Sequence, residues 1–162
     1  MSRRRRGERA VSMVEFCVVA PLFLLLVVLI LDFGRAIYVK NTLDAAAREG
    51  ARRAVLNNAP TSAQVESVIH GHSSDVSLAN PCAYTTPAAP AAGDTGLIYL
   101  SAPPGGDSSA STPGCTVPAT VSGHAPIKVT IVYRYEPMTP LLASVLGGGI
   151  VFESTSTMTT EY

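Results

Sequence analysis

Residues 3–35 read RRRRGERAVSMVEFCVVAPLFLLLVVLILDFGR, and this stretch decides the fold class. No charged residue occurs from Phe16 to Leu31, and Met13 and Val14 extend the apolar run toward the roughly 20 residues that cross a bilayer as a helix. Glu15 lies at the edge of the run, where a carboxylate costs less than the roughly 3 kcal/mol that it costs at the bilayer centre. The pattern predicts a transmembrane helix over residues 11–32.

Basic residues are concentrated before this span and predict its orientation. Five arginines precede it, and residues 1–53 hold ten basic and five acidic side chains, against two basic and seven acidic ones in the rest of the chain. Short arginine-rich flanks stay on the cytoplasmic side, so everything after Asp32 is expected to be exported. The same arginines could form a nucleic-acid-binding arm, but the adjacent span already explains them and no nucleic-acid partner is expected.

The residues after the span predict that the helix continues. Residues 33–58 are rich in alanine and contain no proline, which favours helix. Two acid-to-base pairs four residues apart, Asp44 with Arg48 and Glu49 with Arg53, are expected on a solvated face. Small residues recur at three- and four-residue spacing and predict a helix-packing stripe that requires a close partner surface. The stripe comprises Leu43, Ala46, Ala47, Gly50, Ala51 and Ala54.

Residues 59–162 are predicted to form an exported domain with a small antiparallel sheet. A short helix is expected near Thr61, where Gln64 completes a capping box. The segment IKVTIVYRY, residues 127–135, alternates apolar and polar side chains and is the clearest strand. IVFESTSTMTTEY, residues 150–162, is expected to return antiparallel to it, and GLIYLS and CTVPATV are weaker strand candidates. The fold class is therefore α+β, with a long N-terminal transmembrane helix that continues into the exported domain.

Two cysteines bracket the proline- and glycine-rich part of the exported domain. Cys82 and Cys115 would both lie outside the cytoplasm, where disulfides persist, and we expect them to pair. A metal site is the alternative, but neither cysteine has a C-x-x-C partner or a histidine at ligand spacing.

The sequence gives no indication of an enzyme or of a cofactor. His70 and His72 are two residues apart and do not share a helical face, and His124 is distant in sequence, so no metal site is expected. LGGGI, residues 146–150, lacks the lysine and hydroxyl residue of a phosphate-binding loop and is interpreted as a turn.

Four features together resemble the TadE-like pseudopilins of the tight-adherence, or Flp-type IV, pilus system. They are AVSMVEF at residues 10–16, Pro21, LDFGR at residues 31–35 and AAREGARRAV at residues 46–55. The resemblance covers about residues 7–55. It implies a pilin-like fold and a minor pseudopilin that takes part in pilus assembly from the bacterial inner membrane, in a single pass with its C-terminal domain periplasmic or extracellular.

The resemblance also implies that residues 1–10 are a basic leader, removed on the cytoplasmic face by a prepilin peptidase. The family favours glycine or alanine before the cut and an acid at the fifth mature position. Cleavage between Ala10 and Val11 satisfies both, because Glu15 is then fifth. Cleavage between Gly7 and Glu8 is the alternative, and it would make Glu15 eighth.

The implied partners are the inner membrane, the peptidase, other pilins or pseudopilins and the pilus assembly platform. In that setting Glu15 would neutralise the free amino terminus of an adjacent subunit within a low-dielectric environment. Two alternatives stay open. Glu15 could simply favour the start of the helix near the membrane interface, and the whole chain could be a membrane-tethered protein whose exported domain binds a ligand or an envelope component.

Overall fold

The computed structural model describes residues 3–56, 62–79, 88–91, 93–101 and 126–159. The chain divides into two compact units, Met1–Arg35 and Ala36–Tyr162. The described elements follow the order α1, α2, β1, β2, β3, α3, β4. Helix α1 belongs to both units, and all the other elements belong to the second, so the second unit is the folded domain.

Helix α1 covers Arg3–Leu56 without interruption. Alanine, leucine and arginine, which are good helix formers, dominate its sequence, and the helix continues through Pro21. The prediction that the helix extends beyond Asp32 is therefore confirmed. A second helix, α2, covers Ser62–His72 and places Val65 and Ile69 in the core.

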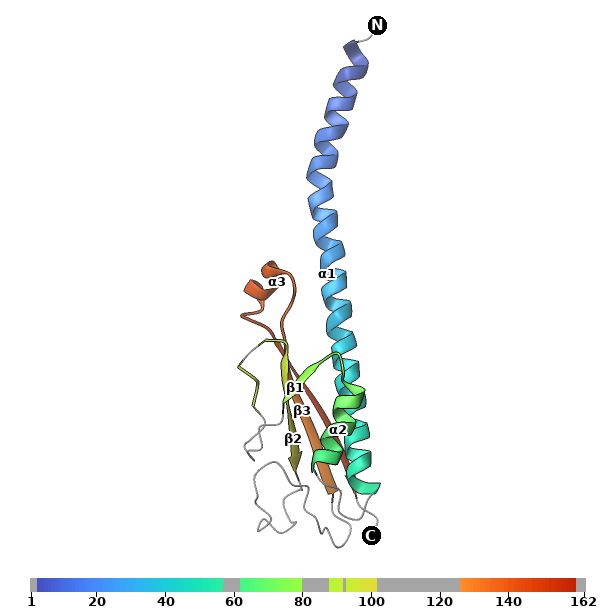
Figure 1. Ribbon diagram of the computed structural model, residues 1–162. Helices are drawn as coiled ribbons and strands as arrows, with labels where there is room; N and C mark the ends of the chain where they lie inside the picture. Colours follow the sequence, from blue (N-terminus) through green and yellow to red (C-terminus); the bar gives the residue numbers. More distant parts are fainter. Residues whose placement is uncertain (1–2, 57–61, 80–87, 92, 102–125, 160–162) are drawn as a thin grey trace. The chain divides into compact units, whose positions relative to one another are not determined.

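Four strands form one sheet in the order β1, β2, β3, β4 (Figure 1). Strands β2 (Thr95–Ser101), β3 (Pro126–Tyr135) and β4 (Ile150–Thr159) pair antiparallel, with Ile98 opposite Ile131 and Ile131 opposite Ser154. The strand predictions at GLIYLS, IKVTIVYRY and IVFESTSTMTTEY are confirmed. CTVPATV lies outside the described residues.

The expectation of a purely antiparallel sheet is wrong, because β1 (Ser77–Ala79) pairs parallel to β2. Three residues are too few to display a strand periodicity, so no local pattern indicates this strand. Gly96 permits the pairing. A Cβ at Gly96 would lie 2.5 Å from Leu78 Cδ2 and 2.8 Å from Tyr133 Cδ2, so a larger residue there would require these side chains to shift. The α+β class holds, with a mixed sheet.

The second unit has its core between the helices and one face of the sheet. Seven residues of α1 join Val65 and Ile69 of α2 in a single buried cluster with the sheet: Ala36, Val39, Leu43, Ala46, Ala47, Ala51 and Ala54. The sheet contributes side chains that share one face by register: Ile98, Leu100, Ile127, Val129, Ile131, Tyr133 and Tyr135. This is the apolar face that alternation predicted for β3.

The connection between β3 and β4 contains a short helix, α3 (Pro140–Val145), which the sequence did not predict. Three glycines with positive φ, Gly147, Gly148 and Gly149, follow it. The amide of Gly148 donates to the carbonyl of Ala143, which closes the end of the helix. A Cβ at Gly149 would lie 2.7 Å from the carbonyl oxygen of Tyr135, so glycine is required where the chain returns to the sheet. The interpretation of LGGGI as a turn is confirmed.

Candidate functional site

The first unit presents an almost continuous apolar surface. In the described residues, one helix is long and apolar enough to cross a membrane, and its most apolar window contains no buried residue. A core helix of a soluble protein would bury that window. The exposed large apolar side chains of this unit are Met13, Val14, Phe16, Val18, Val19, Leu22, Phe23, Leu24, Leu25, Leu26, Val28, Ile30, Leu31 and Phe33. This composition indicates a single-pass membrane protein.

Glu15 is exposed on this apolar surface. It lies one turn before Val18 and Val19 and directly beside Val14 and Phe16, all of which are exposed and apolar. A lone carboxylate in such surroundings is unfavourable in a bilayer unless a cation pairs with it. The surroundings of Glu15 would therefore favour a cationic partner, and its role in assembly stays a prediction.

The residues expected around the processing site lie in the first turns of α1. Gly7, Glu8, Ala10 and Val11 are all helical in their backbone. Ala10 precedes Glu15 by five residues, about 7.5 Å along a helix at 1.5 Å per residue. Where the peptide bond is cut stays a prediction.

The helix-packing stripe lies on the domain side of the chain and is covered by the domain itself. All six of its residues are buried. At Gly50 the contact is closest, because a Cβ there would lie 2.6 Å from Ile69 Cγ1 and 3.8 Å from Val129 Cγ1. The partner surface that this stripe requires is thus formed by α2 and β3 of the same chain. Glu15 belongs to the other unit.

A polar network that the sequence did not reveal fixes α1 against the last strand. Lys40 Nζ lies 2.6 Å from Asp44 Oδ1 and 3.0 Å from the carbonyl oxygen of Glu153, to both of which it donates. The hydroxyl of Ser154 donates to the same carboxylate oxygen of Asp44. The four-residue spacing of Lys40 and Asp44 could have indicated the ion pair, but no local signal points to Ser154.

The ion pairs differ from those expected on the solvated face. Asp44 pairs with Lys40, while Arg48 Nε donates to the backbone carbonyl of Asp44 at 3.1 Å. Glu49 Oε1 lies 3.7 Å from Arg52 Nη1 instead of the predicted Arg53. The first difference accompanies two contacts with β4: Ser154 donates to the Asp44 carboxylate, and the carbonyl of Glu153 accepts from Lys40.

The pKa of Asp44 is shifted by this network. Burial alone raises it, but the hydrogen bonds from Lys40 and Ser154 and the charges of Lys40 and Arg48 outweigh burial, so the pKa lies below its ordinary value of 3.8. Asp44 is therefore ionised at neutral pH and holds the strand and the helix together as an anion.

The remaining candidates divide between described and undescribed residues. Cys82, Cys115 and His124 lie outside the described residues, so their predicted roles stay predictions. His72 Nδ1 lies 3.0 Å from the carbonyl oxygen of Val68 in its own helix. Across the residues that the structure describes, no group of three or more His, Cys, Asp or Glu side chains is placed to hold a metal ion.

Comparison with known proteins gives one finding, and it falls on the N-terminal helix. No curated protein and no solved structure matches the chain. Residues 10–52 match the family described as TadE-like protein. The matched region begins at the predicted cut, includes Glu15 and the apolar run, and ends within the buried stripe. The chain therefore carries a TadE-like segment over residues 10–52, which confirms the resemblance found in its sequence.

Proposed function

We propose that this protein is a minor pseudopilin that takes part in the assembly of a tight-adherence pilus. The observation that carries the proposal is the match of residues 10–52 to the TadE-like family, on a helix whose first unit is apolar and exposed. The match supports involvement in such a pilus. The details below rest on the chemistry of the individual residues.

The proposed sequence of events begins in the inner membrane. The apolar part of α1 inserts with the arginine-rich residues 1–10 on the cytoplasmic side. A prepilin peptidase then hydrolyses the Ala10–Val11 peptide bond, which removes the leader and leaves a free ammonium group at Val11. This ammonium is a new cation near hydrocarbon, where an unpaired charge is costly.

Glu15 supplies the complementary charge in this proposal. Its exposed carboxylate is available to the ammonium of an adjacent subunit, and the attraction is strong because little water screens it. The pair would also fix the axial position of one subunit relative to the next. The exposed apolar side chains around it would pack against neighbouring helices as they leave the lipid.

The stripe has a different part in this scheme. Because α2 and β3 cover it, it holds the exported domain on its own helix and is unavailable to a second subunit in this structure. The packing between subunits would accordingly use the first unit, whose apolar side chains are exposed.

The test compares processing and pilus output in cells that encode the chain and the peptidase. Deleting the gene should abolish or reduce pili, and the wild-type chain should restore them. N-terminal sequencing of the membrane-extracted protein should show a shortened chain, and a peptidase-deficient strain should retain the full leader. An intact leader in peptidase-containing cells, together with normal pili in the deletion strain, would overturn the proposal in favour of a membrane-tethered binding protein.

A further inference from the structure

The exposed large apolar side chains of the second unit are unevenly distributed. Six occur among its described residues. One is Leu56, at the end of α1. The other five form what we call the entry-end patch: Ile37, Tyr38, Met138, Leu146 and Val151.

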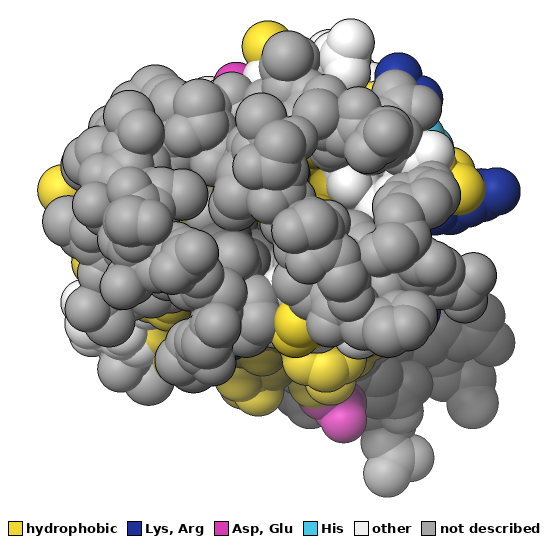
Figure 2. Space-filling model, turned by 90° about the horizontal axis from the view of Figure 1, so that it is seen from below, with side chains coloured by type: hydrophobic (Ala, Val, Ile, Leu, Met, Phe, Trp, Pro, Cys, Tyr) yellow, Lys and Arg dark blue, Asp and Glu magenta, His cyan; other side chains and the backbone are white. Residues whose placement is uncertain are grey.

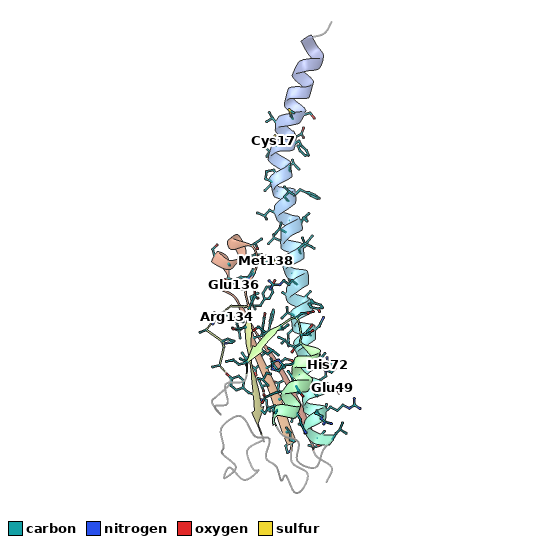
Figure 3. All side chains as sticks on the ribbon, viewed as in Figure 1. Cys17, Glu49, His72, Arg134, Glu136 and Met138 are labelled. Atoms are coloured by element: carbon teal, nitrogen blue, oxygen red, sulfur yellow. The ribbon has the colours of Figure 1, made fainter. Side chains whose placement is uncertain are left out.

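Hydrogen bonds and strand register place these five residues at one end of the domain. Val151 pairs with Arg134 near the end of β3, and Met138 and Leu146 lie in the connection that follows. Lys40 of α1 donates to the carbonyl of Glu153 at the start of β4, which brings residues 37 and 38 of α1 to the same end. Figure 3 shows Arg134, Glu136 and Met138 succeeding one another away from the sheet. This is the end at which α1 enters the domain.

The opposite end differs in character. There the last turns of α1 carry Arg48, Glu49, Arg52 and Arg53. Figure 2, which views the molecule from below, shows Lys and Arg side chains at one edge of the described surface.

Chain connectivity holds the entry end close to the membrane. Only residues 32–35 separate Leu31, the end of the apolar run, from Ala36, the start of the second unit. Even a fully extended chain spans at most about 18 Å over these five steps at 3.6 Å each. This bound applies at any orientation of the two units.

The chemistry of the patch suits a lipid interface. Residues 137–152, PMTPLLASVLGGGIVF, contain no charged side chain, and Met138 is 77% exposed. Tyr38 combines an exposed ring with a hydroxyl that donates to Asp75 at 3.0 Å, and such amphipathic side chains are typical of the headgroup region. Charges of both signs lie at this end, Glu136 and Asp75 as well as Arg134 and Lys40, and such a mixture suits a zwitterionic lipid surface.

We propose that the entry-end patch contacts the headgroup region of the bilayer that anchors the chain, so that the exported domain rests on a zwitterionic lipid surface. The proposal relies on the membrane insertion of α1 that is part of the proposed function, and it is independent of pilus participation. Without this contact, five apolar side chains would stay exposed to water at the end of the domain that the transmembrane helix keeps close to the lipid.

The absence of tryptophan from the chain gives a direct test. The full-length protein is reconstituted at low density into phosphatidylcholine vesicles with and without brominated acyl chains, which quench tryptophan on contact. Three single-tryptophan variants are compared: Met138→Trp in the patch, Phe23→Trp in the span and Leu56→Trp at the other end of α1. All three replace exposed apolar side chains, so the fold is expected to tolerate them.

The expected result is loss of most of the fluorescence for Phe23→Trp, a smaller but clear loss with a blue-shifted emission for Met138→Trp, and no loss for Leu56→Trp. Adding Leu146→Asp to Met138→Trp should remove the quenching, because a charge then enters the patch.

Two outcomes separate the inference from the insertion of α1. If tryptophan at position 138 is quenched as little as tryptophan at position 56, while tryptophan at position 23 is quenched, then α1 inserts and the inference is overturned. Absence of quenching at position 23 would overturn both. A blue shift at position 138 that appears only at high protein density, without bromine quenching, would assign the patch to a second copy and also overturn the lipid contact.

Discussion

Ser154 of the last strand donates its hydroxyl to the carboxylate of Asp44, which lies 110 residues earlier in α1. Both Ser154 and the adjacent Ile131 on β3 are buried, so this bond joins the helix to the edge strand at the boundary of the core. Ser154→Ala should destabilise the domain by about 1.5–3 kcal/mol, the usual net value of a hydrogen bond to a charged group. Urea unfolding of the detergent-solubilised protein measures it. Thr157→Ala, at an exposed position of the same strand, is the control and should change little.

The ionisation of Asp44 predicts a pH dependence. Its pKa in the folded protein lies below the ordinary value of 3.8, so its charge stabilises the fold fully above that value, and this contribution is lost as the pH falls through the folded pKa. Asp44→Asn should therefore be less stable than wild type at pH 7, and the difference should shrink below about pH 4. Urea midpoints of both proteins at several pH values test this. A difference that stays constant down to strong acid would contradict the role of the charge.

Gly50 is predicted to be specific for glycine because Ile69 fills the space beside it. Replacing an exposed helical glycine by alanine gains about 1 kcal/mol, whereas overpacking a core costs about 1–3 kcal/mol. The gain in helix propensity offsets part of the packing cost, so the effect of Gly50→Ala should range from none to a destabilisation of about 2 kcal/mol. Gly71→Ala, where nothing lies within 4 Å of the added methyl, should be stabilising. In a protein that also carries Ile69→Ala, Gly50→Ala should destabilise the fold less than it does in wild type, because the clashing side chain is gone. If the destabilisations of the two substitutions simply add, the contact between Gly50 and Ile69 is not the cause.

The processing site is predicted from the Ala10 and Glu15 spacing. The mature protein should begin at Val11 and have 162 − 10 = 152 residues, which intact-mass spectrometry measures. Ala10→Leu should block cleavage, because the peptidase requires a small residue before the cut, whereas Gly7→Leu should be processed normally. The reverse pattern, with a mature start at Glu8, would exclude a fifth-position role for Glu15.

The role of Glu15 is predicted to be in assembly and not in insertion. Glu15→Ala and Glu15→Gln should both insert and be cleaved, because insertion loses only a residue that opposed it. Both should reduce pilus output strongly, since neither can form an ion pair with an ammonium group. Pilus yield and crosslinking between subunits are compared at matched membrane levels. Glu49→Gln is the control, because it breaks only a surface pair with Arg52. Normal assembly of both Glu15 variants would leave Glu15 as a helix-start residue.

The sequence by itself determined the helix, the three longer strands and the candidate membrane span. These features depend on local periodicity and composition: the apolar run before Asp32, the alanine-rich continuation and the alternation in β3. The positions of Glu15 and Ala10 relative to each other follow from counting alone. The small-residue stripe was visible for the same reason, since its spacing is that of one helical face.

Only the tertiary structure decided which groups meet across the chain. It assigned α2 and β3 as the partners of the stripe, and it added the parallel strand β1. It also gave Asp44 an ion pair with Lys40 instead of Arg48, and a hydrogen bond from Ser154. It also placed Tyr38, Met138 and Val151, which are far apart in sequence, at one end of the domain. Local patterns reveal which face of an element is apolar, but the partner of that face depends on the packing of segments distant in sequence.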